Sequence, residues 1–375
     1  MIQTIGIIGG GQLGRMLTLD AKRMGYKVIV LDPTPNSPCG QVADEQIVAQ
    51  YGDKEAIVKL GESCDIITYE FENIDINAVK TLEGRGFKVT PSSDVLRITQ
   101  DRMLEKTFLR EAGVPVGNFA KVDRIDDINI AAAAVGYPAV LKTTRGGYDG
   151  KGQWLCDSAT PAKQAFAAAK GNTLIFEQYI PFTKELSVIG VRNAHDKVVT
   201  YPVSENVHEY GILTESIVPA RVSNDTAERA YAITRIIAHQ LKIVGVFCVE
   251  FFMMHEGELM VNEVAPRPHN SGHYSMDAMP TSQYEQHIRA ICNLPLAAPV
   301  LLSNAVMVNI LGDGKGDRLH GVEKLLHEDK IVLHLYGKKH AVDRRKMGHF
   351  TVLCDGVEEG IHKAKEGLAK LSWGH

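Results

Sequence analysis

Cysteine and tryptophan are scarce in this sequence, and long apolar runs are absent. Only 6 cysteines and 2 tryptophans occur among 375 residues. No two cysteines form a Cys-x-x-Cys pair, so neither a zinc site nor a disulfide framework is suggested. No stretch of about 18 apolar residues occurs, and the chain begins with a predicted strand and a glycine turn rather than a charged, then apolar leader. We therefore expect a cytoplasmic protein with no membrane partner.

The sequence also lacks an excess of positive charge. Its 41 lysines and arginines are outnumbered by 45 aspartates and glutamates, which gives a formal net charge of −4. A nucleic-acid-binding protein would need a basic stripe to release counterions from phosphates, so we expect small-molecule partners and no nucleic acid. Hydrophobic residues make up 45% and charged residues 23% of the chain, values typical of a globular protein. A chain of 375 residues is too long for one ordinary core, which predicts two or three domains.

The first hundred residues alternate between predicted strands and helices, which indicates a parallel sheet with helices on both faces. A helix over 101–112 leads into a small lobe at about 115–180, and a larger, mostly antiparallel unit follows. The segment 294–299 looks like a linker before a small α/β tail. The predicted fold class is α/β (α+β overall). The predicted strands and helices of the first unit are 4–8, 12–24, 27–31, 54–61, 65–69, 78–83 and 87–90, and the predicted domains are 1–100, 101–293 and 294–375.

A predicted hairpin carries two carboxylates. Strands over 245–254 and 258–265 would align Glu250 with Glu263 across the ladder, close enough for two hard oxygen ligands to share magnesium ions that bridge nucleotide phosphates. The alternative is a pair of solvated residues on an exposed hairpin. The neighbours of Glu250 within 246–252 are mostly apolar, and a charge there is costly unless it is paired or binds a metal. This favours a metal site.

A glycine-rich loop lies upstream, at 142–153, between two predicted strands and with lysines on either side. Such a composition is typical of a flap whose backbone amides cradle phosphate. A merely mobile loop is the alternative, but Tyr148, Asp149 and Lys151 interleave with the glycines. The flap and the acidic hairpin together predict a phosphoryl-transfer site.

A second glycine motif points to a rival class. Residues 9–14 fit G-x-G-x-x-G after a strand and before a helix, and Asp32 closes the next strand, as in NAD-dependent oxidoreductases. The same turn can bind any phosphate or sugar, or only pack the helix on the sheet. After Thr90 the βαβ pattern does not continue into the second half that a dinucleotide fold needs.

The flap together with Glu250, Asn262, Glu263 and Arg267 resembles the ATP-grasp superfamily, and the resemblance covers almost the whole chain. It implies an ATP-grasp fold with an N-terminal parallel α/β domain, split central lobes and a small C-terminal domain. Five segments more closely resemble the 5-(carboxyamino)imidazole ribonucleotide synthase family: 9–16, 69–73, 148–153, 265–273 and 344–349.

Membership of that family implies a purine-biosynthesis ligase. It would join bicarbonate to 5-aminoimidazole ribonucleotide while ATP becomes ADP and phosphate, through carboxyphosphate, with Mg²⁺ (or Mn²⁺) as the metal and a homodimer as the assembly. Other possibilities are a formate-dependent glycinamide ribonucleotide transformylase, a biotin carboxylase and a catalytically dead nucleotide-binding module. Tyr148 and Asp149 in the flap favour the aminoimidazole substrate.

The resemblance also implies site residues. Only one of Glu70 and Glu72 can face the ligand, because the two alternate across a strand end. The basic run at 344–346 could instead be a solvated face. The implied nucleotide contacts are Arg102, Lys142, Gly147, Tyr148, Asp149, Gly150, Lys151, Gly152, Gln153, Glu177, Gln178, Tyr179, Ile180, Glu185, His208, Asn262 and Glu263; the metal ligands are Glu250 and Glu263; the catalytic residues are Tyr148, Asp149, Lys151, Arg267 and His269; and the ribonucleotide contacts are Gln12, Leu13, Glu70, Glu72, Lys338, Arg345 and Lys346.

Overall fold

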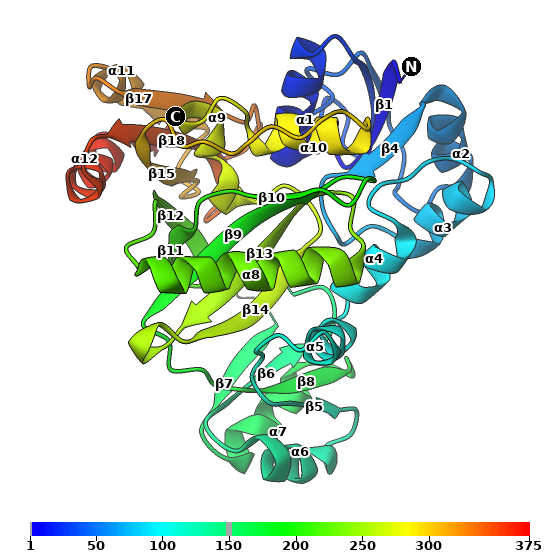
Figure 1. The fold of residues 1–375 in the computed structure, drawn as a ribbon, viewed down its shortest axis with the longest axis vertical. Helices are drawn as coiled ribbons and strands as arrows, with labels where there is room; N and C mark the ends of the chain where they lie inside the picture. The colour runs from blue at the N-terminus through cyan, green and yellow to red at the C-terminus, as the bar shows by residue number, and fades with distance from the viewer. Residues whose placement is uncertain (1, 148–151) are drawn as a thin grey trace.

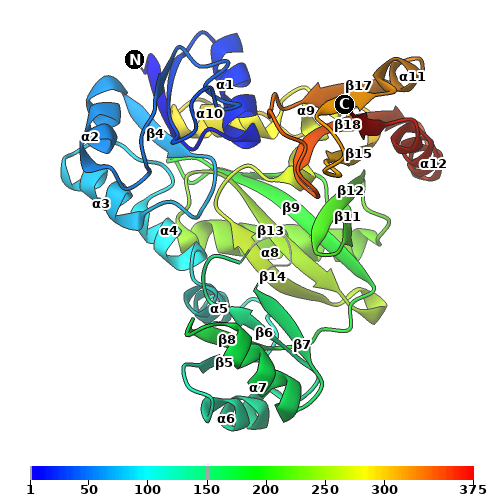
Figure 2. The same ribbon diagram turned by 180° about the vertical axis from the view of Figure 1, so that it is seen from behind.

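The structure is a computed structural model that describes residues 2–147 and 152–375. Figures 1 and 2 show an N-terminal α/β unit, a large central sheet and a small lobe at the opposite end from the N-terminal unit. Among the described residues, no helix combines the length and the apolar character that crossing a bilayer requires.

The N-terminal unit is built on a parallel sheet whose strands are mostly buried, as expected when helices cover both faces. Helices α2, α3 and α4 each begin after a side chain that accepts a backbone N–H, namely Asp53, Asp75 and Ser92. The elements are β1 (Thr4–Ile8), α1 (Gln12–Arg23), β2 (Lys27–Leu31), β3 (Glu45–Ile47), α2 (Lys54–Ser63), β4 (Ile66–Tyr69), α3 (Ile76–Gly84) and α4 (Ser93–Thr99), and the strand order is β3-β2-β1-β4.

The small lobe follows the connecting helix α5 (Arg102–Glu111). It is a four-stranded antiparallel sheet, and the helices α6 and α7 pack together against it. The glycine-rich loop joins β6 to β7. The elements are β5 (Phe119–Val122), α6 (Asp127–Val135), β6 (Ala139–Thr143), β7 (Gln153–Cys156), α7 (Ala159–Ala168) and β8 (Leu174–Gln178), and the strand order is β5-β8-β6-β7.

The central sheet is antiparallel, and its C-terminal strands continue the same sheet. Its first elements are β9 (Lys184–Arg192), β10 (Val198–Thr200), β11 (Ser204–Glu209), β12 (Ile212–Val218), α8 (Asn224–Leu241), β13 (Gly245–Met253), the 3₁₀ turn η1 (His255–Gly257), β14 (Leu259–Ala265), the 3₁₀ turn η2 (Asn270–Gly272), α9 (Ser275–Ala278) and α10 (Gln283–Ile291). The last elements are β15 (Asn304–Leu311), β16 (Arg318–His320), α11 (Val322–Leu326), β17 (Ile331–Leu335), β18 (Lys346–Cys354), α12 (Val357–Ala369) and β19 (Ser372–Gly374). The strand order is β14-β13-β9-β11-β12-β15-β18-β17, with β10 beside β9 and a separate pair β16-β19.

The two faces of this sheet differ. Helix α8 lies across one face, in front of β9, β13 and β14 in Figure 1. On β13 the alternate residues Phe247, Val249 and Phe251 are buried in the core beneath α8. Because side chains alternate along a strand, Cys248 and Glu250 point to the opposite face. The polar residues of β13 therefore lie on the side away from α8.

Helix α10 ties the N-terminal unit to the central sheet. Its Tyr284 and Ile288 are buried in one cluster with Leu13 and Leu17 of α1. On its other side, His287 accepts a hydrogen bond at Nδ1 from the backbone N–H of Val246 in β13 (3.1 Å), and its Nε2 lies 2.9 Å from the Thr68 hydroxyl of β4. The two sheets are thus connected through buried α10, and Val95 of α4, which lies in the core beneath α8, adds a second contact between the units.

The structure corrects one expectation about elements. Residues 87–90 do not form a strand of the sheet: within 2–147 this segment makes only an isolated bridge, between Ile67 and Val89. The predicted α/β tail after residue 294 is present, and its strands β15, β17 and β18 extend the central sheet. The division of the chain at residues 100 and 293 stays a prediction.

Candidate active site

A cavity of about 1180 Å³ lies where the three parts meet. Its lining includes strand ends of the N-terminal unit, the flap strands of the small lobe, the face of the central sheet opposite α8, and the C-terminal segment. Of the predicted site residues, those that line it are Gln12, Leu13, Glu70, Glu72, Arg102, Lys142, Gly147, Gln153, Glu177, Gln178, Tyr179, Ile180, Glu185, His208, Glu250, Asn262, Glu263, Arg267, His269 and Lys346.

Some predicted residues are elsewhere. Gly152, Lys338 and Arg345 are not among the lining residues. Tyr148, Asp149, Gly150 and Lys151 lie outside the described residues. Their predicted roles stay predictions.

The acidic pair lies as the hairpin pattern predicts. Glu250 of β13 is the direct cross-strand partner of Glu263 of β14. Burial, and then the neighbouring Glu263 carboxylate, together raise the pKa of Glu250 to about 8. Two carboxylates held together in a buried place repel each other unless a cation lies between them. With the Asn262 side chain also on the cavity, this all-oxygen set fits a hard divalent ion such as Mg²⁺.

Arg267 and His269 lie beside this pair. The Arg267 guanidinium makes a two-pronged ion pair with Glu72, in which Nη2 donates to Oε1 at 3.0 Å and Nε donates to Oε2. Although burial opposes it, Arg267 holds the pKa of Glu72 below its usual range. His269 Nε2 lies 3.4 Å from a Glu250 oxygen. Burial, and then the Arg267 charge, hold the pKa of His269 well below its usual value, so this ring is neutral.

The small-lobe side of the cavity is lined by residues of α5, β6 and β8. Lys142 donates to Glu177 at 2.9 Å, beneath the link at 179–183 that joins the small lobe to β9. Arg102 donates to the carbonyl oxygens of Thr143 (3.1 Å) and Gly147 (3.4 Å), at the start of the flap. On β9 and β11, Glu185 and His208 pair at 2.9 Å. The two cations predicted to contact phosphates, Arg102 and Lys142, therefore line the same cavity.

Two site residues were missed by the sequence reasoning. Glu105 and Lys106 of α5 are buried, and they form hydrogen bonds with the backbone of β14 on both sides of Glu263. Lys106 Nζ donates to the carbonyl oxygens of Val261 (3.2 Å) and Asn262 (2.6 Å), and Glu105 accepts from the Val264 N–H (2.7 Å). The sequence did contain a signal for these two residues. An adjacent acid and base on the apolar side of a predicted helix need buried partners, which indicates a structural or functional role.

The N-terminus of α1 is capped by a carboxylate of the protein itself. Glu70 is buried, and its carboxylate accepts from the backbone N–H groups of Gly11 and Gly14, the latter at 2.7 Å. Asp32 accepts from the Gly10 N–H (2.7 Å) and from the Tyr51 hydroxyl (2.6 Å). The helix terminus and the acid that a dinucleotide would use are therefore engaged by the chain itself. This arrangement disfavours the oxidoreductase alternative.

Asp277, His334 and His349 form a separate cluster whose ligand atoms lie within 4.8 Å of one another. The two imidazoles stack, with centroids 4.6 Å apart and planes 20° from parallel. Nitrogen lone pairs lie in the ring planes, so two stacked rings cannot both point at one ion. His349 is instead bonded through Nδ1 to the Tyr336 hydroxyl (2.8 Å), and His334 to Asp277 (2.9 Å). We interpret the cluster as structural.

Comparison with known proteins places the chain among the ATP-grasp enzymes. Residues 107–284 match the ATP-grasp domain, residues 2–100 match the ribonucleotide synthetase preATP-grasp domain, and residues 305–363 match the phosphoribosylaminoimidazole carboxylase C-terminal domain. The ATP-grasp match spans the small lobe and the first strands of the central sheet, and the C-terminal match spans the strands β15, β17 and β18 that continue this sheet.

Relatives along the whole chain define the family. The N5-carboxyaminoimidazole ribonucleotide synthase of Bacillus subtilis (strain 168) is 47% identical over 96% of this chain and 93% of its own length. The crystal structure of an ADP complex of an N5-carboxyaminoimidazole ribonucleotide synthetase is similar with a TM-score of 0.92 at 48% identity, over 97% of this chain and 96% of that one. A structure of the Aspergillus clavatus synthase in complex with ADP and 5-aminoimidazole ribonucleotide has a TM-score of 0.92 at 32% identity, over 98% of both chains. The chain belongs to the N5-carboxyaminoimidazole ribonucleotide synthase family, which confirms the predicted family, fold and ATP-dependent ligase class.

Proposed function

We propose that this protein carboxylates the exocyclic amine of 5-aminoimidazole ribonucleotide with bicarbonate while ATP becomes ADP and phosphate. The observation that carries this proposal is the placement of Glu250 and Glu263 on the same cavity as Arg267 and His269. The residues proposed for phosphate transfer and those proposed to bind an oxyanion therefore line one cavity.

The first step activates bicarbonate. One bicarbonate oxygen attacks the γ-phosphorus of ATP, ADP leaves, and carboxyphosphate forms. Transfer of this kind depends mainly on positioning and charge neutralisation. Lys142 and Arg102 would neutralise phosphate oxygens from the small-lobe side. Glu250, Glu263 and Asn262 would hold Mg²⁺, which when bound neutralises charge on the phosphates and aligns them for transfer.

The second step forms the carbon–nitrogen bond. The substrate amine attacks the carbonyl carbon of carboxyphosphate, phosphate leaves, and the amine loses a proton. Arg267 suits bidentate capture of the planar oxyanion, and its pair with Glu72 fixes the guanidinium in the cavity before substrate arrives. The enclosure by three parts of the chain keeps water from carboxyphosphate.

The ribonucleotide is assigned to the N-terminal and C-terminal side of the cavity. Gln12, Leu13 and Lys346 line that side. Glu72, which is paired with Arg267, also lines the cavity. Both acids have their oxygens engaged, Glu70 by the start of α1 and Glu72 by Arg267. Glu70 is buried whereas Glu72 is partly exposed, so Glu72 is the better candidate for a direct ligand contact.

A homodimer in the cytoplasm, with Mn²⁺ able to replace Mg²⁺, completes the proposal. Its support is the family to which the chain belongs. Light scattering of the purified protein should give twice the mass of 41.1 kDa, and a monomer at all concentrations would contradict the dimer.

Phosphate release tests the function. We expect rapid release from ATP when bicarbonate and 5-aminoimidazole ribonucleotide are both present, with one carboxylated product formed for each phosphate. Formate with glycinamide ribonucleotide, the second substrate pair, should give none. Turnover with the formate pair and none with the bicarbonate pair would overturn the proposal in favour of a transformylase.

A further inference from the structure

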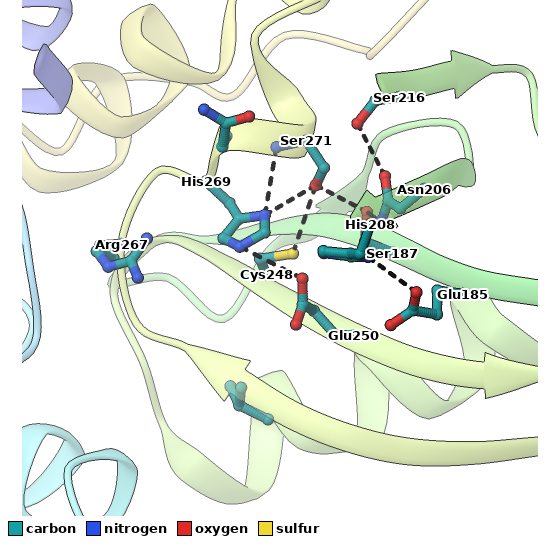
Figure 3. A network of polar contacts seen from close by, with 12 residues as sticks. Glu185, Ser187, Asn206, His208, Ser216, Cys248, Glu250, Arg267, His269 and Ser271 are labelled. Carbon is teal, nitrogen blue, oxygen red and sulfur yellow. Dashed lines mark hydrogen bonds and ion pairs between the residues drawn. The ribbon is translucent and has the colours of Figure 1, made fainter. Parts of the chain in front are cut away.

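A chain of buried polar side chains runs across the central sheet towards His269 (Figure 3). It begins at Ser216 of β12, whose hydroxyl donates to Asn206 of β11 at 2.8 Å. Asn206 donates from Nδ2 to Ser187 of β9 at 2.9 Å, and Ser187 donates to Ser271 of η2 at 2.7 Å. Ser187, Ser216 and Ser271 are 0% exposed. Buried polar side chains need hydrogen-bond partners, and here each residue of the chain supplies one to the next.

The chain ends on the imidazole of His269. Nδ1 of this ring lies 2.8 Å from the Ser271 hydroxyl and also 3.3 Å from the Ser271 backbone N–H. A backbone N–H can only donate, so Nδ1 must be the acceptor. The Ser271 oxygen already accepts from Ser187, which leaves its own hydrogen to donate to Nδ1. Both contacts therefore require the unprotonated form of Nδ1.

The other ring nitrogen faces the reaction centre. In Figure 3, His269 lies between Ser271 on one side and Glu250 on the other, and Nε2 is 3.4 Å from a Glu250 oxygen. The backbone is fixed as well: the Gln283 amide accepts from the His269 N–H (2.9 Å) and donates to its carbonyl oxygen (2.7 Å). Gln283 is 0% exposed. The ring is therefore held at its backbone and at one edge, with its second edge directed into the cavity.

We infer that Ser216, Asn206, Ser187 and Ser271 are positioning residues that hold His269 in the Nε2–H tautomer, so that it presents a hydrogen-bond donor to the oxygens of bicarbonate and carboxyphosphate. The opposite tautomer would direct a lone pair at those oxygens and repel the negative charge that develops there. This inference rests on the proposed function for its substrate, while the tautomer itself is a property of the protein alone.

The first measurement is the tautomer. Nitrogen-15 NMR of the full-length protein labelled at histidine, with the His269 signals assigned by comparison with His269→Gln, should show Nδ1 unprotonated and Nε2 protonated. A protonated Nδ1 in the wild-type protein would overturn the inference, whatever reaction the enzyme performs. Failure of the proposed function would instead appear as missing bicarbonate-dependent turnover with the tautomer unchanged.

Two variants test the role of the chain. Ser271→Ala removes the closer contact to Nδ1, and Asn206→Asp replaces the amide donor with a group that accepts from both neighbouring serines. We expect both to shift His269 towards the Nδ1–H form and to lower kcat by about tenfold or more, with little change in the KM for ATP. Lower kcat with an unchanged tautomer would reduce the chain to a structural role and overturn the inference, as would a shifted tautomer with unchanged kcat.

Thr351→Val provides a matched control. Thr351 lies on β18 of the same sheet, is 0% exposed, and its hydroxyl has no hydrogen-bond partner among the described residues. Removing this hydroxyl should change neither the tautomer of His269 nor kcat. If the control changed both as much as Ser271→Ala does, general loosening of the sheet would explain the result and the inference would fall.

Discussion

At the scale of single residues, the cross-strand pair of Glu250 and Glu263 is the proposed magnesium site. We predict that Glu263→Gln lowers kcat by about a hundredfold or more, because one carboxylate fewer leaves phosphate charge uncompensated in the transition state. The metal-free protein should unfold at the same temperature or higher, since Glu250 no longer faces a second carboxylate. Steady-state kinetics and thermal unfolding without magnesium measure the two effects.

Glu258→Gln is the matched control for this change, because Glu258 is an exposed residue on the same hairpin. It should leave kcat unchanged. Near-wild-type kcat in Glu263→Gln would remove Glu263 from the metal site.

A second prediction concerns His287, which is neutral because burial lowers its pKa to about 3. In the unfolded chain its pKa is about 6.5, so between those values the unfolded state binds the extra proton. Stability from this group is complete above pH 6.5 and is lost as the pH falls towards 3, by about 2 kcal/mol between pH 6.5 and 5. Urea unfolding at pH 7.5 and pH 5 should therefore show a smaller loss of stability in His287→Gln than in the wild type. Equal losses would mean that His287 is protonated in the folded protein.

At the scale of elements, α5 fixes β14 through Lys106. Lys106→Met would leave the carbonyl oxygens of Val261 and Asn262 without their buried donor. We expect a loss of roughly 2–4 kcal/mol of stability and, at saturating ATP, a higher magnesium concentration for half-maximal activity, because Glu263 lies next to the released backbone.

Chemical denaturation and a magnesium titration test this prediction. Lys163→Met, at an exposed position on α7, is the control and should change neither quantity. A variant that lost stability but kept the wild-type magnesium dependence would confine Lys106 to a role in folding.

The elements that the sequence predicted well are those with a strong local pattern. The hairpin of β13 and β14 was placed within one residue at each end, because a run of apolar residues surrounds Glu250 and a turn separates the strands. The strands β11, β12 and β18 and the helix α10 were missed. Helix α10 is rich in polar residues, a composition typical of an exposed helix, yet its Gln283, Gln286 and His287 are 0% exposed, since their partners come from distant segments.

The same limit applied to the site. Glu250, Glu263 and the flap could be found because each motif is contiguous in sequence and chemically distinctive. The Ser187 to His269 chain could not be found, because serine and asparagine within strands are common and their connection depends on which strands are neighbours. The order β9-β11-β12, which brings these side chains together, is set by long-range pairing.

At the scale of the whole molecule, the cavity exists only because parts far apart in sequence meet. The C-terminal strands continue the central sheet, and this carries the segment around Lys346 to the start of α1. Lys338 donates to the Lys346 carbonyl oxygen at 2.6 Å and lies over the Tyr336 ring at 5.5 Å. It therefore stabilises the segment around Lys346 and does not line the cavity. The nucleotide and the ribonucleotide are thus expected on different parts of the chain.

The last prediction separates two adjacent cations in that segment. Lys346 lines the cavity, whereas Arg345 is exposed and donates to the His340 carbonyl oxygen at 3.2 Å. A charge-assisted contact to phosphate contributes roughly 1.5–3 kcal/mol, about a tenfold to hundredfold change in affinity. Lys346→Met should raise the KM for 5-aminoimidazole ribonucleotide by that factor and leave the KM for ATP nearly unchanged, and Arg345→Met should have the smaller effect. The sequence alone gave both cations the same role. If Arg345→Met matches Lys346→Met, the segment must close around the phosphate on binding; if instead the KM for ATP rises, the two substrates have been assigned to the wrong parts of the molecule.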